Sequence, residues 1–525
     1  MFNKQIRINQ NFLILILALF SLAVNQFYGN KGTFPIEGFA FFDTAYRILQ
    51  GEAPFKDYWA VSGIFIDYTQ SIFFKIFGIH FQVYVFHASL INSLLTLMTF
   101  FFAKSLKIKN HFSFFYALTF SLLAYTTSGT LYVDNHSSLL CLAAIYFFIF
   151  GILKEKKKYF FFIPILIGFA FFTKPAPTVY IFLLLLSLLF VYILLNKKYH
   201  IFNILLSSSL IFIIFIFIFF YFQSIPILLI FEQYFYFPIT IANQRYENFA
   251  LSLDNIFFNF KFIYIFLIPL ILINIKNILL STKYLLKKDF LIFLVILGFS
   301  FCLIFHQINT KNQLFILFLI PVLCIFLHSQ LSKIESKNKD KFIIFFIIIS
   351  IFLTYKYHVR FNENRKFHEM VNVNFNLAEN AKEIDSKLSG LKWISPTYST
   401  SPDTEISLIK DTLKILKIDK SNKMVITNYS FFSAILEKKI HSPSRWFISN
   451  GAAYPIKANK YFSNYQNYLI DKIKNKKIDS IFIVEPVKSD EIFRYINSDC
   501  FNKKEMNKIT SKYEIIPKCQ LKNKE

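Results

Sequence analysis

The chain has 525 residues, of which 55% are hydrophobic, 17% are charged and 71 are phenylalanine. This apolar excess is too large for a water-soluble surface, and it excludes disordered, collagen-like and disulfide-scaffold proteins. A net charge of +25 would suggest nucleic acid in a soluble chain, but most lysines before residue 342 lie between apolar runs. Membrane topology accounts for them there, so no nucleic-acid partner is predicted.

Apolar runs of membrane-spanning length follow one another up to about residue 356. The first, about residues 11–28, follows Lys4 and Arg7. A cleavable signal peptide is the alternative, but no clear A-x-A cleavage motif ends this run, which favours an uncleaved helix. Further spans are predicted near residues 81–103, 112–127, 137–153, 159–172, 178–195, 201–222, 262–275, 290–306, 312–328 and 342–356. We therefore predict a polytopic α-helical membrane protein with about eleven transmembrane helices, each sized for a hydrocarbon core of about 30 Å.

The apolar stretch 159–195 could also be read as one helix. At about 1.5 Å per residue that helix would be roughly 55 Å long, with Lys174 near its centre at a cost of about 3 kcal/mol. Pro175 and Pro177 favour a break, because proline removes a backbone donor and disfavours helix in the residue before it. The stretch is therefore predicted to form two spans.

Clusters of lysine orient the predicted helices. They fall on alternate connections, near residues 104–109, 154–158, 197–198, 276–288 and 333–341. Short lysine-rich connections are cytoplasmic, and long domains cross the membrane largely regardless of charge. The intervening loops are predicted to face outward, at about 29–80, 126–137, 173–177, 223–261 and 307–311. With the N-terminus inside, eleven spans also place the C-terminal tail outside.

The tail differs in composition from the rest, which predicts two domains. Residues 1–356 form the transmembrane domain, and the polar, lysine-rich residues 357–525 form a small soluble α/β domain. Strand-like runs begin at Val425 and at Ile481, and helical patterns cover 431–438 and 460–476. No G-x-G-x-x-G motif or P-loop supports a nucleotide site. Two tail cysteines, Cys500 and Cys519, are one possible disulfide.

The first outward loop is rich in acidic and aromatic residues. It contains Glu37, Asp43, Tyr46 and Arg47, followed by a Gly-Glu-Ala-Pro-Phe-Lys-Asp segment that starts at Gly51. A solvated interfacial loop, whose acids balance its basic residues, is the simpler interpretation. The mixed charge and aromatic content indicate a more structured loop.

Other outward connections hold further polar candidates. Asp134 and His136 lie just before the span predicted from residue 137, where Asp134 could simply cap the helix. Lys174 could snorkel to the interface, or bind a phosphate as a point charge beside an acidic pocket. Because all these residues lie at one membrane face, they permit a shared site with Glu37 and Asp43.

The order of these features resembles the GT-C glycosyltransferases. An acidic motif after the first helix is followed by A-x-R-I-L-x-G-x-x-P-[FY]-x-D, then Phe77-Gly78, the outward Asp134 and the T-K-P motif at Lys174. The chain is similar in particular to the protein-mannosyltransferase and aminoarabinose-transferase-like enzymes. The resemblance covers residues 1–200 well, the later helices by hydropathy and the tail weakly.

This resemblance implies an inverting transfer of a sugar from a polyprenyl-phosphate co-substrate to a lipid, glycan or protein acceptor. It implies a multi-pass protein of the bacterial inner membrane, acting at its outer face, with an extracytoplasmic C-terminal domain. The usual base is an aspartate, often in an Asp-Glu pair. Its distance to the G-x-x-P motif fits Glu37 better than Asp43, yet Ile36-Glu37 departs from the pair, so both remain candidates.

The other predicted roles follow from the same chemistry. Asp134 would be a second essential carboxylate, and Asp134 or His136 could position the acceptor or assist the base. Lys174 and Arg245 could neutralise the departing lipid phosphate. Tyr46 is a further substrate-binding candidate. The need for a divalent metal stays open.

Two rival functions stay open at this point. A transporter or flippase of lipid-linked saccharides would place ionisable groups near the bilayer midplane and show internal repeats or broken helices. A polysaccharide ligase or polymerase is a related transferase that the sequence separates poorly.

Overall fold

The computed structural model describes residues 9–125, 127–247, 249, 252–311, 315–517 and 519. The chain forms two compact units. The first contains residues 1–28, 88–216 and 249–364, and the second contains 29–87, 217–248 and 365–525. The second unit therefore combines the first predicted outward loop with most of the C-terminal tail. The boundary at 356/357 stays a prediction, because this grouping follows contacts in space and not order along the chain.

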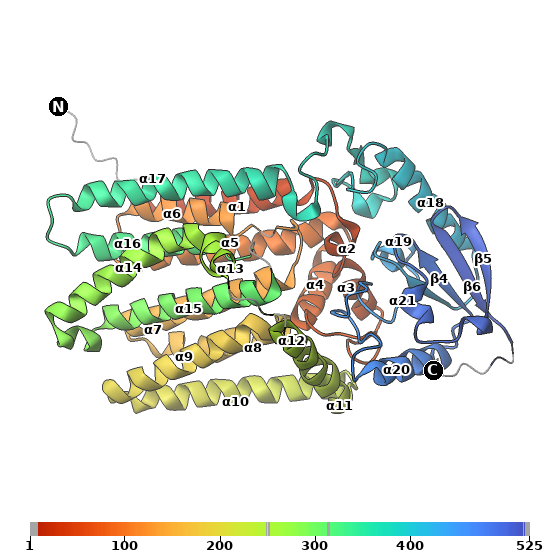
Figure 1. The fold of residues 1–525 in the computed structure, drawn as a ribbon, viewed down its shortest axis with the longest axis horizontal. Coiled ribbons are helices and arrows are strands. Elements are labelled where there is room, and N and C mark those ends of the chain that lie inside the picture. The colour runs from red at the N-terminus through yellow and green to blue at the C-terminus, as the bar shows by residue number, and fades with distance from the viewer. Residues whose placement is uncertain are drawn as a thin grey trace. The chain divides into compact units, whose positions relative to one another are not determined.

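The long helices confirm the predicted fold class (Figure 1). They are α1 (Gln10–Gly29), α5 (Phe81–Ser105), α6 (Asn110–Leu123), α7 (Val133–Lys154), α8 (Lys157–Thr173), α9 (Pro175–Leu195), α10 (Tyr199–Phe222), α14 (Lys261–Leu280), α15 (Lys288–Thr310), α16 (Leu319–Ser332) and α17 (Lys339–His358), with the short α13 (Leu253–Ile256). Every predicted span overlaps one of them. Within the described residues, 8 helices are long and apolar enough to cross a membrane, so the number eleven stays a prediction.

The long helices differ in the share of their residues that is buried inside the protein. In the 18-residue window of α7, 89% of residues are buried inside the protein, whereas α10 has 11% buried at a mean hydropathy of 2.7. A helix that is apolar all round and exposed all round needs an apolar solvent. Lipid is that solvent. In the first unit, α7 packs against α8, α9 and α15.

The break predicted in the 159–195 stretch is confirmed. Helix α8 ends at Thr173 and α9 begins at Pro175. Between them, Lys174 has extended backbone angles, φ −157° and ψ 124°. This is the conformation that a following proline favours. The break places the lysine side chain at the ends of two helices.

The second unit contains an α/β fold, as the composition of the tail predicts. Its helices are α2 (Pro35–Gly38), α3 (Phe42–Leu49), α4 (Ile64–Phe77), α11 (Ile227–Ile230), α12 (Phe237–Glu247), α18 (Pro402–Ile418), α19 (Phe432–Leu436), α20 (Phe462–Asn475) and α21 (Asp490–Phe493). Its strands are β1 (Glu379–Asn380), β2 (Lys392–Trp393), β3 (Lys423–Ile426), β4 (Ser480–Val484), β5 (Phe501–Asn507) and β6 (Thr510–Ile515).

Four of these strands form one mixed sheet in the order β3-β4-β6-β5. Strands β3 and β4 are parallel, while β6 is antiparallel to both β4 and β5. The apolar run of β4 is buried at every position, and Ile481 and Ile483 share a core with Leu469 and Ile473 of α20. The two predicted strands and both predicted helices of the tail are confirmed.

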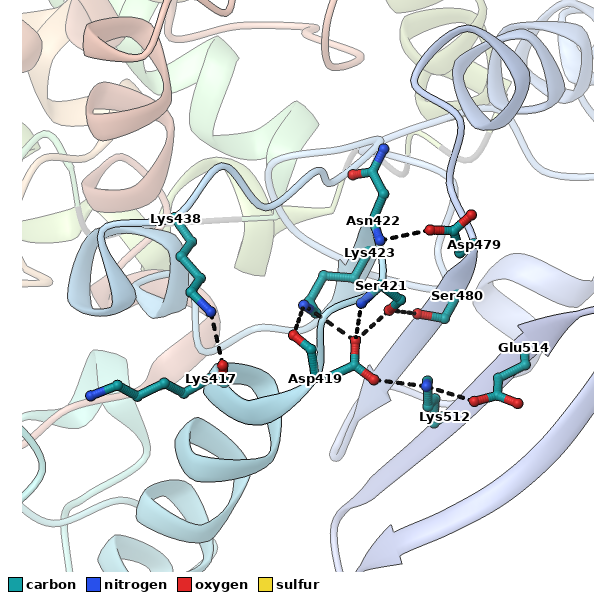
Figure 2. Close-up of polar contacts among 10 residues, drawn as sticks. All are labelled: Lys417, Asp419, Ser421, Asn422, Lys423, Lys438, Asp479, Ser480, Lys512 and Glu514. Atoms are coloured by element: carbon teal, nitrogen blue, oxygen red, sulfur yellow. Dashed lines mark hydrogen bonds and ion pairs between the residues drawn. The ribbon is translucent and has the colours of Figure 1, made fainter.

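An ion-pair cluster joins the connection between α18 and β3 to strand β6 (Figure 2). The Asp419 carboxylate lies 2.7 Å from Lys512 Nζ on β6 and 3.3 Å from Lys423 Nζ on β3, and it accepts a hydrogen bond from the Ser421 backbone N–H at 2.9 Å. Burial alone would raise the pKa of Asp419, but Lys512, Ser421 and Lys423 together lower it to about 2. The carboxylate is therefore ionised at neutral pH and fixes one end of β3.

Cys500 and Cys519 form a disulfide, with 5.5 Å between their Cα atoms. Reduction, or replacement of Cys500 by serine, should lower the stability of the second unit by about 3 kcal/mol, the value typical of a short closed loop. Peptide mapping by mass spectrometry, after alkylation with and without reductant, measures the bond directly. Two free thiols in protein purified from the membrane would contradict it.

Candidate functional site

Asp43 lies in the first turn of α3, and α19 packs against this helix. Its side chain is buried, at 8% exposure. The sequence places Phe42 and Ala45 beside it on α3, and both are fully buried. These apolar neighbours hold the helix in place by packing, and only a small part of the aspartate is exposed.

A pocket that opens to solvent has Asp43 among its lining residues. Its wall combines α3 with β3 and the segment that follows β3. Seven of its lining residues carry a hydroxyl group: Thr44, Thr427, Tyr429, Ser430, Ser433, Ser442 and Ser444. The others are Asp43, Arg47, Arg445, Val425, Phe432 and Ile440. Such a lining suits a polar ligand that bears several hydroxyl groups.

The electrostatics of Asp43 favour proton acceptance. Burial raises the pKa of its carboxyl group, while Arg47 and Ser433 act in the opposite direction. Among the described residues, Asp43 Oδ1 has no hydrogen-bond partner. A buried acceptor without a partner is costly, and a ligand hydroxyl in the pocket would satisfy it.

Arg47 pairs with Glu52, so Asp43 is left without a dedicated cation. Arg47 Nε donates to Glu52 Oε2 at 2.7 Å, and His441 Nδ1 lies 2.9 Å from Glu52 Oε1. Burial alone would raise the pKa of Glu52, but Arg47 and His441 hold it well below its usual range. Glu52 therefore balances Arg47, as the simpler interpretation of this loop predicts, but the pair is buried and not solvated as that interpretation supposed.

A second buried ion pair includes Arg445, which lines the pocket. Asp67, which is fully buried, pairs with Arg445 and accepts hydrogen bonds from Thr44 Oγ1 at 2.5 Å and Tyr58 OH at 2.9 Å. Arg445 Nη1 also donates to the Ser62 carbonyl at 2.7 Å. This pair could not be predicted from local sequence patterns, because its members are 378 residues apart.

In the first unit, the structure brings together Asp134, Lys174 and a third residue, His306. Lys174 Nζ donates to both carboxylate oxygens of Asp134, at 2.7 and 2.6 Å. His306 Nε2, from the last turns of α15, lies 2.9 Å from Asp134 Oδ1. The helix N-cap, Tyr132, makes no side-chain cap hydrogen bond. Asp134 thus pairs with two basic groups in place of the capping role that the sequence also allowed.

The remaining candidates lie elsewhere within their units. Glu37 is half-buried on α2, and Tyr46 is buried on α3, but neither lines the pocket of Asp43. Arg245 is exposed near the end of α12. His136 is fully buried in the first turn of α7. Because Asp43 and Asp134 belong to different units, the joint site remains a prediction.

A metal ion is held by several donor side chains that converge on one point. Within the described ranges, no group of three or more His, Cys, Asp or Glu side chains is arranged to hold a metal ion. The question of a divalent metal, left open by the sequence, stays open.

Comparison with known proteins gives one family match. Residues 61–222 match the family described as dolichyl-phosphate-mannose-protein mannosyltransferase. This confirms the resemblance to GT-C membrane glycosyltransferases over less than a third of the chain. The matched range contains Asp134 and Lys174 but starts after Glu37 and Asp43.

One similar solved structure is that of ArnT from Cupriavidus metallidurans bound to undecaprenyl phosphate. Its TM-score is 0.47 and its sequence identity 10%, over 97% of this chain and 99% of that chain. Among curated proteins, no significant match is found.

Proposed function

We propose that this chain is a membrane glycosyltransferase that moves a sugar from a polyprenyl-phosphate donor to a hydroxyl group of a lipid, glycan or protein acceptor. One observation carries the proposal. Asp43 presents a buried carboxylate, with one oxygen lacking a partner among the described residues, in a pocket lined by hydroxyl side chains. The family match over residues 61–222 supports the same class of reaction.

Asp43 is the proposed general base. It accepts the proton of the acceptor hydroxyl as the acceptor oxygen attacks the anomeric carbon. The bond from that carbon to the phosphate oxygen breaks, and the lipid phosphate leaves with the bonding electrons. Attack opposite the leaving group inverts the configuration. A base works best with a pKa near the operating pH, and the raised pKa of Asp43 shifts it in that direction.

Asp43 is preferred over Glu37 for this role. Asp43 lines the pocket, whereas Glu37 lies on α2 and is not among the lining residues. The spacing to the G-x-x-P motif favoured Glu37, but it measures only distance along the chain. The position of the pocket in space supports Asp43. His136 and Tyr46, buried in their helices, are proposed to shape the site by packing.

Lys174 is the proposed partner of the departing phosphate. It has three N–H donors, of which two reach Asp134. Its side chain is 21% exposed, against 7% for Asp134, so Lys174 is the more accessible member of the pair. Arg245, exposed on α12, is a weaker candidate for the same task.

The reaction is proposed to occur at the outer face of a bacterial inner membrane. Disulfides persist in oxidising compartments and are rare in the cytosol. The bond between Cys500 and Cys519 therefore supports an extracytoplasmic location for the C-terminal residues. The alternating lysine clusters support the same orientation.

A transporter or flippase of lipid-linked saccharides is the alternative. Transporters place ionisable groups near the bilayer midplane. Here, the paired groups lie at helix ends: Asp134 in the first turn of α7, Lys174 between α8 and α9, and His306 near the end of α15. This placement favours chemistry at a membrane face over passage through the middle of the helices.

Replacing Lys174 with methionine tests the phosphate role. The variant should transfer sugar at least about tenfold more slowly at limiting donor, because the lipid phosphate loses a charge-assisted hydrogen bond. The measurement is release of radiolabelled sugar from a polyprenyl-phosphate donor by purified protein. Lys56→Met, at an exposed lysine, is the matched control and should keep wild-type kinetics. Equal kinetics for both variants would remove Lys174 from the site.

A further inference from the structure

The pair between Asp134 and Lys174 raises a problem of charge. The negative charge of the carboxylate and the positive charge of the ammonium group cancel. The pair alone therefore gives no net electrostatic attraction for an anionic lipid. A phosphate would also compete with Asp134 for the donors of Lys174. A third group in contact with the pair must therefore decide the net charge of this cluster.

His306 is that group. Its Nε2 lies 2.9 Å from Asp134 Oδ1, the oxygen that also accepts from Lys174 Nζ at 2.7 Å. Its side chain is 2% exposed. Among the described residues, the charged groups placed at its Nε2 are Asp134 on α7 and, through the shared carboxylate, Lys174 before α9. The Asp134 carboxylate thus contacts two basic side chains at once.

We propose that His306 is a positioning residue that gives this cluster its net positive charge, so that Asp134, Lys174 and His306 form a phosphate-binding site with a proton-dependent affinity. With a neutral imidazole, whose Nε2–H still donates to Asp134, the net charge of the three side chains is zero. With an imidazolium it is +1. Asp134 stabilises the imidazolium by accepting a hydrogen bond from it. The carboxylate therefore keeps two cationic side chains in place.

This inference rests on the proposed function, because it concerns the phosphate of the same lipid donor. It assigns Asp134 a role distinct from proton abstraction. It also explains why a carboxylate, which by itself repels phosphate, lies in direct contact with the proposed phosphate partner.

Binding of a phosphodiester tests the proposal without any acceptor. The probe is a polyprenyl methyl phosphate diester, which lacks the second ionisation near pH 6 that phosphate monoesters undergo. The control lipid is the corresponding polyprenol. Wild-type protein in detergent should bind the diester about tenfold more tightly at pH 5.5 than at pH 8, because protonation of His306 adds one positive charge to the cluster.

His306→Gln separates charge from geometry. Glutamine can place an N–H near the position of imidazole Nε2 but cannot gain a proton. The variant should bind the diester at pH 8 about as well as the wild type, and its affinity should not rise at pH 5.5. His111→Gln, at an exposed histidine, should keep the wild-type profile.

The outcomes separate this inference from the proposed function. If wild type and His306→Gln share one pH profile, the inference fails while a lipid-phosphate donor remains supported. If the wild type binds the diester no better than the polyprenol, the phosphate site and the proposed donor class both fail.

Discussion

Replacing Asp43 with asparagine should lower the rate of sugar transfer by at least about a hundredfold, the lower end of what general-base catalysis contributes. Asparagine keeps the size of the side chain but cannot accept the proton of the acceptor hydroxyl. The protein should accumulate normally in the membrane, because the amide keeps an oxygen that can accept from Ser433 and Oδ1 has no partner to lose among the described residues. Turnover at saturating donor is the measurement.

Glu37→Gln is the matched control, because it makes the same carboxylate-to-amide change at the other candidate. It should keep turnover within a fewfold of the wild type. A large loss in Glu37→Gln with normal turnover in Asp43→Asn would reverse the assignment. Near-wild-type transfer in both variants would contradict a base in this loop.

The same base predicts the direction of the pH dependence. Burial raises the pKa of Asp43, and only the ionised form accepts a proton. Turnover should therefore rise with pH through this raised pKa and then level off. A profile that falls over this range would indicate that a protonated group is needed there instead.

Replacing Glu52 with glutamine should destabilise the second unit by about 3–5 kcal/mol, the usual cost of leaving a buried charge without its partner. Arg47, at 2% exposure, loses the carboxylate that its guanidinium group contacts. Lys472 loses a neighbouring negative charge, and burial already lowers the pKa of Lys472 to about 7. The midpoint of thermal unfolding in detergent measures the effect.

The contribution of Glu52 to the stability of the wild type depends on pH, and its sign follows from the pKa. The pKa of Glu52 in the folded protein lies below its ordinary value of 4.5. Its contribution is therefore present above about pH 4.5 and is lost as the pH falls through the folded pKa. Glu437→Gln is the control, because Glu437 is 69% exposed in its pair with Lys387 and should contribute little. Equal unfolding midpoints for both variants at pH 7 would contradict the buried network.

The sequence predicted those features of the fold that depend on local residue patterns. Hydropathy located the long helices, Pro175 located the break at Lys174, and an apolar run located strand β4. Each of these is set by neighbours along the chain. The sequence also selected both members of the Asp134–Lys174 pair, since charged residues beside apolar spans are conspicuous.

Partners far apart in the sequence could not be predicted in this way. His306 sits in an apolar helix and reaches a carboxylate 172 residues earlier. Arg445 lies in a polar segment of the tail and pairs with Asp67. Nothing in the neighbouring sequence distinguishes these two residues. Only the fold brings them into contact with their partners. The same holds for the seven hydroxyl side chains of the pocket, most of which follow β3.

The most direct test is the chemistry of the wild-type protein reconstituted in vesicles with a radiolabelled polyprenyl-phosphate sugar and a membrane extract as acceptor source. We predict that one polyprenyl phosphate is released for each sugar that becomes attached to an acceptor. Movement of the intact lipid-linked sugar, or of its sugar, across the vesicle membrane with no release of polyprenyl phosphate would contradict the transferase and establish a transporter.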